Sequence, residues 1–286
     1  MKCINQRLES LPPKFWIQST TQSLEKDWSF FKSFLVLTGK VWALLRHSKT
    51  GNGFMVFFSE KIRMVVLTNL HNPSGIYTDN TTIKAVAKIA YDHGASVLVD
   101  EIFLDGSFIK KPSCFGTPNL IVTSSATKIY GLGGLHTGWI IAPKEIAVQC
   151  QRMKAHTTGA SSSYTSEIMT VYLLKNARDD VMKRFQKQAT ANHAVLKKWM
   201  MHHKDLMKWV EPDGGLVCFP KYSLKVPSIV FCKYLFETQK LLVNPGAFFH
   251  GEGHIRLSYG GDTDILQNGL EALADGLQDF HPTRLL

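Results

Sequence analysis

The sequence has no apolar run that approaches the roughly 18 residues needed by a membrane-spanning helix. Its first ten residues, MKCINQRLES, lack the apolar core of a secretory signal. Cysteine is scarce: the five residues are odd in number and show no CxxC spacing. This pattern favours a reducing compartment and structural thiols over a disulfide framework or a metal site. These absences predict a cytoplasmic protein without a membrane partner.

Acidic residues are also in short supply. Lys and Arg number 33 against 23 Asp and Glu, so the formal net charge at pH 7 is +10. A basic excess of this kind is one mark of nucleic-acid-binding proteins. The basic residues are spread along the chain rather than gathered in a stripe, which favours a basic surface around an anion site. We therefore expect no nucleic-acid partner.

Residues 1–60 lack a sustained hydrophobic period, and only Leu35–Leu37 and Phe54–Phe58 have the composition of short strands. From Arg63–Thr68, a continuous apolar run typical of a buried strand, the pattern becomes clear. A helix is expected over 79–93 and further strands or helices follow it. Strands are expected at 96–99, 119–123, 138–142, 214–219, 228–234 and 254–258, and helices at 144–154, 164–176, 177–202 and 264–278.

The first strand, helix and strand form a βαβ unit, which belongs to a parallel sheet. We predict an α/β fold with two domains. Residues 1–177 form a mostly parallel sheet with helices on both faces, although residues 1–60 are uncertain, and residues 178–286 form a smaller C-terminal α+β domain.

Chemically active side chains are expected at the carboxyl ends of three strands. Asn72 follows the first strand, Asp100 ends the second, and Ser124–Lys128 follows the third. Ligands in open α/β sheets bind beyond these ends. A lysine can form an imine with an aldehyde cofactor, an aspartate can keep a pyridine nitrogen protonated, and hydroxyls near glycine-rich backbone suit a phosphate. The pattern predicts a small-molecule site with Lys128 as its nucleophile.

Five motifs stand in order along residues 64–280: TNLHNPSG (68–75), VDEIF (99–103), SSATKIYGLGGLHTGW (124–139), EPDGGLVCFP (211–220) and NPGAFFHGEGHIRLSYG (244–260). Their order and separations resemble those of fold-type I pyridoxal-phosphate enzymes, in particular class I/II aminotransferases. The resemblance implies pyridoxal 5'-phosphate as cofactor, a homodimer, and a large domain that is incomplete at its N-terminus. The family's glycine-rich phosphate loop is not recognisable in the 71 residues before Asn72.

The resemblance also implies roles for single residues. Lys128 is the Schiff-base lysine and proton shuttle, and Asp100 is the partner of the pyridine nitrogen. Asn72 contacts the cofactor's 3-oxygen and the substrate carboxylate, Ser125 binds the phosphate, and Arg256 pairs with the substrate α-carboxylate. Each residue has a structural alternative: a surface lysine, a cap or ion-pair aspartate, a turn asparagine, a serine that caps local backbone, and an arginine in a structural ion pair.

Two cofactor positions depart from the family pattern. Phe103 stands where the family carries a tyrosine, and its ring cannot donate a hydrogen bond to the cofactor's 3-oxygen. His136 stands where the family carries an arginine on the phosphate, and a histidine is charged only in part near neutral pH. We expect the first change to destabilise the oxyanion form of the cofactor's 3-oxygen, and the second to weaken cofactor binding, more so as pH rises.

The implied function is amino transfer between an amino acid and a 2-oxo acid. Two alternatives stay open. Another pyridoxal-phosphate reaction, such as that of a lyase, is compatible with the same scaffold. A non-catalytic protein that keeps the fold would explain Phe103, His136 and the missing loop.

Overall fold

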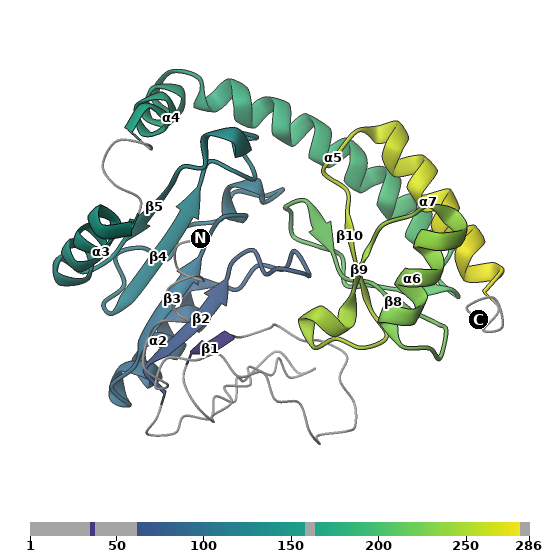
Figure 1. Cartoon of the computed structure of the whole chain (residues 1–286), viewed down its shortest axis with the longest axis horizontal. Coiled ribbons are helices and arrows are strands. Elements are labelled where there is room, and N and C mark those ends of the chain that lie inside the picture. Colours follow the sequence, from purple (N-terminus) through teal and green to yellow (C-terminus); the bar gives the residue numbers. More distant parts are fainter. Residues whose placement is uncertain (1–34, 38–61, 158–163, 281–286) are drawn as a thin grey trace.

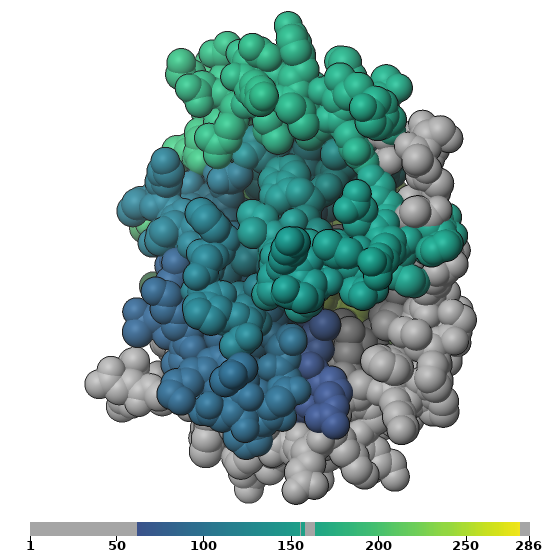
Figure 2. All heavy atoms as spheres, turned by 90° about the vertical axis from the view of Figure 1, so that its left-hand side faces the viewer, coloured from purple at the N-terminus to yellow at the C-terminus, as the bar shows by residue number. Residues whose placement is uncertain are grey.

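A computed structural model of the chain describes residues 35–37, 62–157 and 164–280 (Figure 1). The first part of the described chain forms one five-stranded sheet. Its strands are β1 (Leu35–Leu37), β2 (Met64–Thr68), β3 (Ser96–Asp100), β4 (Leu120–Ser125) and β5 (Gly138–Ile141), in that spatial order. The helices beside it are α2 (Asn80–Asp92), α3 (Lys144–Thr157) and α4 (Tyr164–Asn176). Figure 2 shows the side of the molecule on which α3 and α4 lie at the surface.

The sheet is parallel at its centre and antiparallel at both edges. β2 pairs with β3, and β3 with β4, in parallel, whereas β1 and β5 run antiparallel to their neighbours. The register places Thr68 opposite Asp100, and Asp100 opposite Thr123. The predicted α/β fold class is confirmed, with a mixed sheet in the described part of the chain.

Helix α2 follows from local sequence. The side chain of Asp79 caps it by accepting a hydrogen bond from the Thr82 N–H at 2.9 Å. Four residues at helical spacing are buried against the sheet: Ile83, Val86, Ala87 and Ala90. They form one core with the inward side chains of β2, β3 and β4, so the βαβ unit predicted from the sequence is confirmed.

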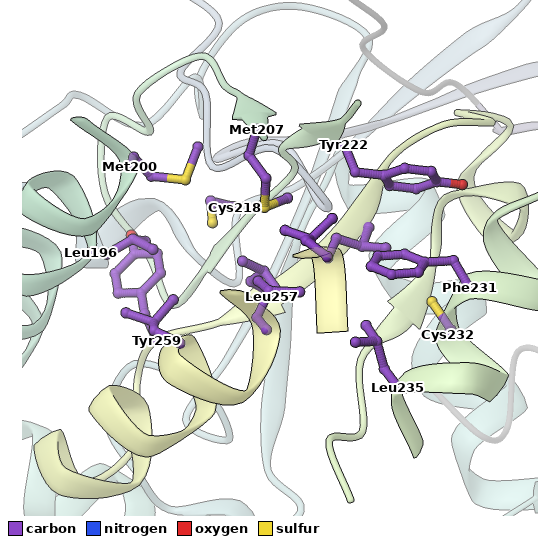
Figure 3. Close-up of a cluster of buried hydrophobic side chains, with 14 of the residues drawn as sticks. Leu196, Met200, Met207, Cys218, Tyr222, Phe231, Cys232, Leu235, Leu257 and Tyr259 are labelled. Atoms are coloured by element: carbon purple, nitrogen blue, oxygen red, sulfur yellow. The ribbon is translucent and has the colours of Figure 1, made fainter. Parts of the chain in front are cut away.

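The C-terminal part is built around the long helix α5 (Arg178–His202). It contains two small sheets, β7–β10–β9 and β6–β8, and two further helices. The elements are β6 (Met207–Lys208), β7 (Val217–Cys218), β8 (Lys221–Tyr222), α6 (Ser228–Gln239), β9 (Asn244–Pro245), β10 (Ile255–Ser258) and α7 (Thr263–Gln278). Figure 3 shows their shared core, a single cluster that includes Leu196 and Met200 of α5 together with Cys218, Phe231 and Leu257.

Helix α5 contacts both parts of the molecule. Val181, Met182 and Phe185, near its start, pack on the cluster around Phe103 and Ile129. Its second half belongs to the C-terminal core. The boundary proposed after residue 177 lies at the start of this helix and stays a prediction.

One predicted strand is wrong. Residues 228–234 belong to helix α6, which extends to Gln239. The run of β-branched and aromatic residues favours a strand by composition. However, the buried positions are Ser228, Phe231, Cys232, Tyr234 and Leu235, and their separations of three and four residues are helical. Tertiary burial therefore overrides local propensity here.

The predicted strand 214–219 is shorter than expected, since only Val217–Cys218 forms a strand. Gly214 and Gly215 have positive φ angles of 154° and 82°, which end the extended pairing. The expected strand Phe54–Phe58 lies outside the described residues. Among the described residues, no helix is both long and apolar enough to cross a bilayer.

Candidate active site

The carboxyl ends of β2, β3 and β4 lie side by side. Thr68 at the end of β2 is in register with Asp100 at the end of β3. β4 continues two residues beyond Thr123, the partner of Asp100, to Ser125, and Lys128 follows three residues later. Figure 1 shows β2, β3 and β4 side by side. The structure therefore brings the predicted aspartate and lysine to the same edge of the sheet.

Asp100 is a largely buried carboxylate. It accepts hydrogen bonds from the Ile102 N–H at 3.2 Å and from the Thr123 hydroxyl at 3.3 Å. Burial raises the pKa of Asp100 above its ordinary value, although both hydrogen bonds oppose the shift. A carboxylate that has lost water in this way gains strongly from a cationic partner, as a protonated pyridine nitrogen would be.

The loop that carries Asn72 is held by its own backbone. The Asn72 N–H donates to the Thr68 hydroxyl at 2.9 Å, and the Gly75 N–H donates to the His71 carbonyl at 2.7 Å. The buried side chain of Asn69 exchanges two hydrogen bonds of 3.0 Å with the backbone of Thr78. The position of Asn72 is therefore fixed by the turn rather than by its own side chain.

The side chain of Asn72 meets Arg256 of β10, far away in the sequence. Arg256 Nη1 donates to Asn72 Oδ1 at 3.0 Å. Because a guanidinium only donates, the amide oxygen must face it, which leaves the Asn72 NH2 group directed elsewhere as a donor. The predicted carboxylate-binding pair thus forms one contact between the sheet and the C-terminal part.

Asp213 was not singled out from the sequence, and it closes this side of the site. Its carboxylate accepts from the Tyr77 N–H at 2.8 Å, and its own N–H donates to the Gly75 carbonyl at 3.0 Å. Its carbonyl accepts from the Phe108 N–H at 2.9 Å. A Cβ on Gly75 would lie 2.7 Å from Pro212 Cβ, so only glycine allows this approach. The motif EPDGG therefore packs against the Asn72 loop and is hydrogen-bonded to its backbone.

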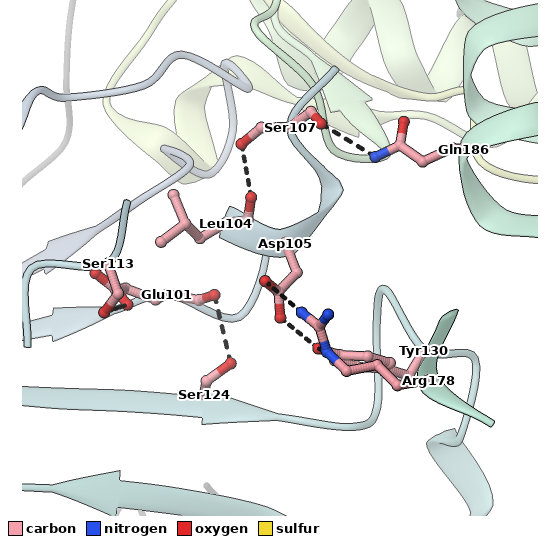
Figure 4. Close-up of polar contacts among 9 residues, drawn as sticks. All are labelled: Glu101, Leu104, Asp105, Ser107, Ser113, Ser124, Tyr130, Arg178 and Gln186. Atoms are coloured by element: carbon pink, nitrogen blue, oxygen red, sulfur yellow. Dashed lines mark hydrogen bonds and ion pairs between the residues drawn. The ribbon is translucent and has the colours of Figure 1, made fainter. Parts of the chain in front are cut away.

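Lys128 is an exposed residue on a segment with buried neighbours. Ile129 and Tyr130 are buried, and the Gly131 N–H donates to the Lys128 carbonyl at 3.1 Å. The Tyr130 hydroxyl donates to Asp105, and Arg178 contacts both: its Nε lies 3.3 Å from the Tyr130 oxygen (Figure 4). Burial and the neighbouring carboxylate raise the pKa of Tyr130 to about 12. The backbone of Lys128 is thereby anchored while its amine stays accessible.

Ser125 is engaged locally. Its oxygen accepts the Thr127 N–H at 3.2 Å and lies 2.6 Å from the Thr127 hydroxyl. This is the backbone-capping alternative that the sequence left open, and a hydroxyl can hold such a bond while it also contacts an anion. The phosphate role of Ser125 stays a prediction.

The two substituted positions differ in their surroundings. Phe103 is buried in a cluster with Leu70, Ile129 and Tyr130, so its ring packs as expected. His136 is exposed and has a positive φ of 50° at the end of a short 3-10 helix, Gly133–Leu135. The next residue, Thr137, accepts the Ala126 N–H at 3.0 Å, so His136 lies beside the Ser125–Thr127 turn.

The site residues fit pyridoxal phosphate at its ring end. A free amine, a desolvated carboxylate and an amide donor are what the aldehyde, the ring nitrogen and the 3-oxygen require. At the phosphate end the described residues offer two hydroxyls and a histidine, without the arginine of the family pattern. The described residues contain no cluster of three or more side chains that could hold a metal ion.

Comparison with known proteins points to the same family of enzymes. The chain matches the family described as aminotransferase class I and II over residues 36–273. It is 25% identical over 236 residues to an aspartate aminotransferase of Pyrococcus horikoshii, covering 79% of this chain and 60% of that protein. It is 24% identical over 222 residues to the capreomycidine synthase of Streptomyces vinaceus, covering 77% of this chain and 57% of that protein.

Solved structures share the fold. A PLP-dependent aminotransferase from Streptococcus suis superposes with a TM-score of 0.71 at 24% identity, covering 78% of this chain and 59% of that one. The PLP-dependent cyclase OrfR superposes with a TM-score of 0.64 at 24% identity, covering 75% and 58%. The chain thus spans about 60% of the length of such relatives. Members of the matching family use pyridoxal phosphate as cofactor. This chain belongs to the aminotransferase class I and II family.

Proposed function

We propose that the chain is a pyridoxal-phosphate-dependent aminotransferase that moves an amino group between an amino acid and a 2-oxo acid. One observation carries the proposal. Lys128 and Asp100 share one edge of the sheet, and Asn72 and Arg256 meet at 3.0 Å beside it. This arrangement supports an amine, a ring anchor and a carboxylate-binding group at one edge of the sheet.

Each residue has a proposed task. The Lys128 ε-amine would hold the cofactor through its aldehyde and would carry the proton at the substrate α-carbon. Asp100 would hold the cofactor at its pyridine nitrogen and keep that nitrogen protonated. Arg256 and the Asn72 amide hold the α-carboxylate, and Ser125 with His136 contacts the phosphate. When bound, the cofactor supplies the electron sink for the α-carbon.

A different reaction on the same cofactor is the second candidate. It is favoured by the similarity to capreomycidine synthase and to the cyclase OrfR. Lyase and cyclase chemistry would use Lys128 and Asp100 in the same way. Arg256 speaks against decarboxylation, because it would hold the α-carboxylate in place. A non-catalytic role remains the third alternative, motivated by Phe103 and His136.

The test is to add pyridoxal phosphate to the full chain and then one amino acid at a time. Amino transfer converts the pyridoxal form to the pyridoxamine form, with one 2-oxo acid released per site. A lyase or cyclase releases product while the pyridoxal form persists. A chain with no near-visible band after the cofactor is added, and no lysine labelled by borohydride, is not a pyridoxal-phosphate enzyme.

Replacing His136 with arginine is expected to tighten cofactor binding by about tenfold near neutral pH, since one charge-assisted fork is worth roughly 1.5 kcal/mol. Equilibrium titration of the visible band at several pH values measures it. His156→Arg on α3 is the matched control. Equal binding by the wild type and His136→Arg would place residue 136 away from the phosphate.

We also propose that the chain is a cytoplasmic homodimer. The helix α4 supports association, because it carries several exposed apolar side chains on a surface visible in Figure 2: Tyr164, Ile168, Val171 and Tyr172. Exposed apolar patches of this kind commonly mark interfaces. Sedimentation velocity at micromolar concentration is expected to give twice the 32.2 kDa chain mass, and a purely monomeric species would contradict the proposal.

A further inference from the structure

Arg256 has a second amide partner besides Asn72. Its Nη2 donates to Asn244 Oδ1 at 2.9 Å. Asn244 lies directly opposite Arg256 in the antiparallel pairing of β9 and β10. Cross-strand neighbours are held close by the backbone ladder, so this contact is set by the register of the sheet.

The face of the guanidinium is covered as well. Arg256 Cζ lies 4.8 Å from the centre of the Phe249 ring, within the range of a cation–π contact. The Phe249 ring in turn meets Phe219 edge-on, with 5.8 Å between the ring centres. One ring on the face and one amide on each terminal nitrogen define the plane of the guanidinium.

The charge of Arg256 is left uncompensated by these partners. Both amides are neutral, and among the described residues no carboxylate forms an ion pair with Arg256. A guanidinium has five N–H donors, and the two amide bonds leave three of them free. Burial lowers the pKa of Arg256, which means that the charged group has lost part of its hydration and gains from an incoming anion.

We propose that Asn244 is a positioning residue for substrate recognition, which together with Phe249 orients Arg256 and, being neutral, reserves its charge for the substrate α-carboxylate. The inference rests on the proposed function, since it takes Arg256 as the carboxylate-binding group. It adds that the acceptor at position 244 must be uncharged. An aspartate there would have the same shape but would occupy the guanidinium as an internal carboxylate.

The experiment compares four variants of the full chain with pyridoxal phosphate present: Asn244→Ala, Asn244→Asp, Arg256→Met and Asn268→Asp. Asn268 is exposed on α7 and is the matched control for the added charge. Calorimetric titration measures the Kd for pyruvate, a small 2-oxo acid, and for pyruvamide, which lacks the carboxylate. Thermal unfolding checks that each variant is folded.

We expect Asn244→Ala to weaken pyruvate binding about tenfold, through the lost orientation. Asn244→Asp should weaken it about 100-fold, because the internal carboxylate competes. Pyruvamide binding should be unchanged in both, as should pyruvate binding to Asn268→Asp. In turnover assays the loss should appear in KM, with kcat changed by less than about threefold.

Failure of the proposed function can be distinguished from failure of the role proposed for Asn244. If Arg256→Met leaves the Kd for pyruvate unchanged, Arg256 does not bind the carboxylate and this part of the proposed function fails. If Arg256→Met weakens binding but Asn244→Asp stays within twofold of the wild type, the positioning role of Asn244 is overturned. A parallel loss of pyruvamide binding in the Asn244 variants would also overturn it, because the effect would then be independent of the carboxylate.

Discussion

Lys128→Ala is expected to abolish the near-visible absorption that pyridoxal phosphate acquires on the protein, and with it amino transfer. Among the described residues that we place at this sheet edge, namely Asn72, Asp100 and Ser124–Lys128, Lys128 carries the one amine that can bond the aldehyde. In the proposed function it also carries the proton, a task whose loss alone costs about 100-fold to 10,000-fold in rate. The measurement is the absorption spectrum, followed by borohydride reduction and peptide mapping.

Lys128→Arg and Lys84→Ala are the matched controls. Arginine keeps the positive charge but cannot form the covalent bond, so Lys128→Arg should lose the band as alanine does. Lys84 is exposed on α2, and its replacement should leave the spectrum unchanged. A label that maps to another lysine in the wild type would remove Lys128 from the site.

Asp100→Asn is expected to lower kcat by about 100-fold or more, the loss found when a single preorganised electrostatic group is removed from an active site. The amide has the shape of the carboxylate but cannot keep the ring nitrogen protonated, so the ring becomes a weaker electron sink. The hydrogen bonds from Ile102 and Thr123 have an acceptor in either variant. Single-turnover absorbance measures the chemical step directly.

The same substitution should stabilise the cofactor-free protein near neutral pH. Burial raises the pKa of Asp100, so the folded state holds this proton more tightly than the unfolded chain does. The contribution of Asp100 to the free energy of unfolding is therefore fully present below its pKa in the unfolded chain. It is lost as pH rises through its pKa in the folded protein. Asp100→Asn removes that loss, so its gain in Tm should vanish on acidification below the ordinary range of aspartate. Asp205→Asn, at an exposed position, should show neither effect.

The central fold could be predicted because its sequence signals are local and strong. Arg63–Thr68 and Ser96–Val99 are continuous apolar runs, and the helix between them has a cap and a helical period. Helix α6 could not be predicted in the same way. Its β-branched and aromatic residues suit a strand by composition, and the helix is explained only by its packing in the C-terminal core, which buries Phe231, Cys232, Tyr234 and Leu235.

The candidate site also has a part that the sequence predicts and a part that it does not. Asn72, Asp100 and Lys128 could be placed at one edge because parallel strands end together. Asp213 contacts Tyr77, which is more than 100 residues away in the sequence. Asn244 contacts Arg256 through the pairing of two short strands. No local sequence pattern predicts either contact. The sequence marks both positions only indirectly, since Asp213 lies within the motif EPDGG and Asn244 within NPGAFF, two of the motifs that carry the resemblance.

The 25 residues of α5 make it a rod about 37 Å long. Its first turn is pinned beside Tyr130 through Arg178, and its last turns are embedded in the C-terminal core. A tilt of about 5° around the pinned end would swing the far end by about 3 Å, comparable to the length of a hydrogen bond. The angle of α5 therefore acts together with the contacts of Asn72 and Asp213 to set the distance between the amine-bearing edge of the sheet and the guanidinium.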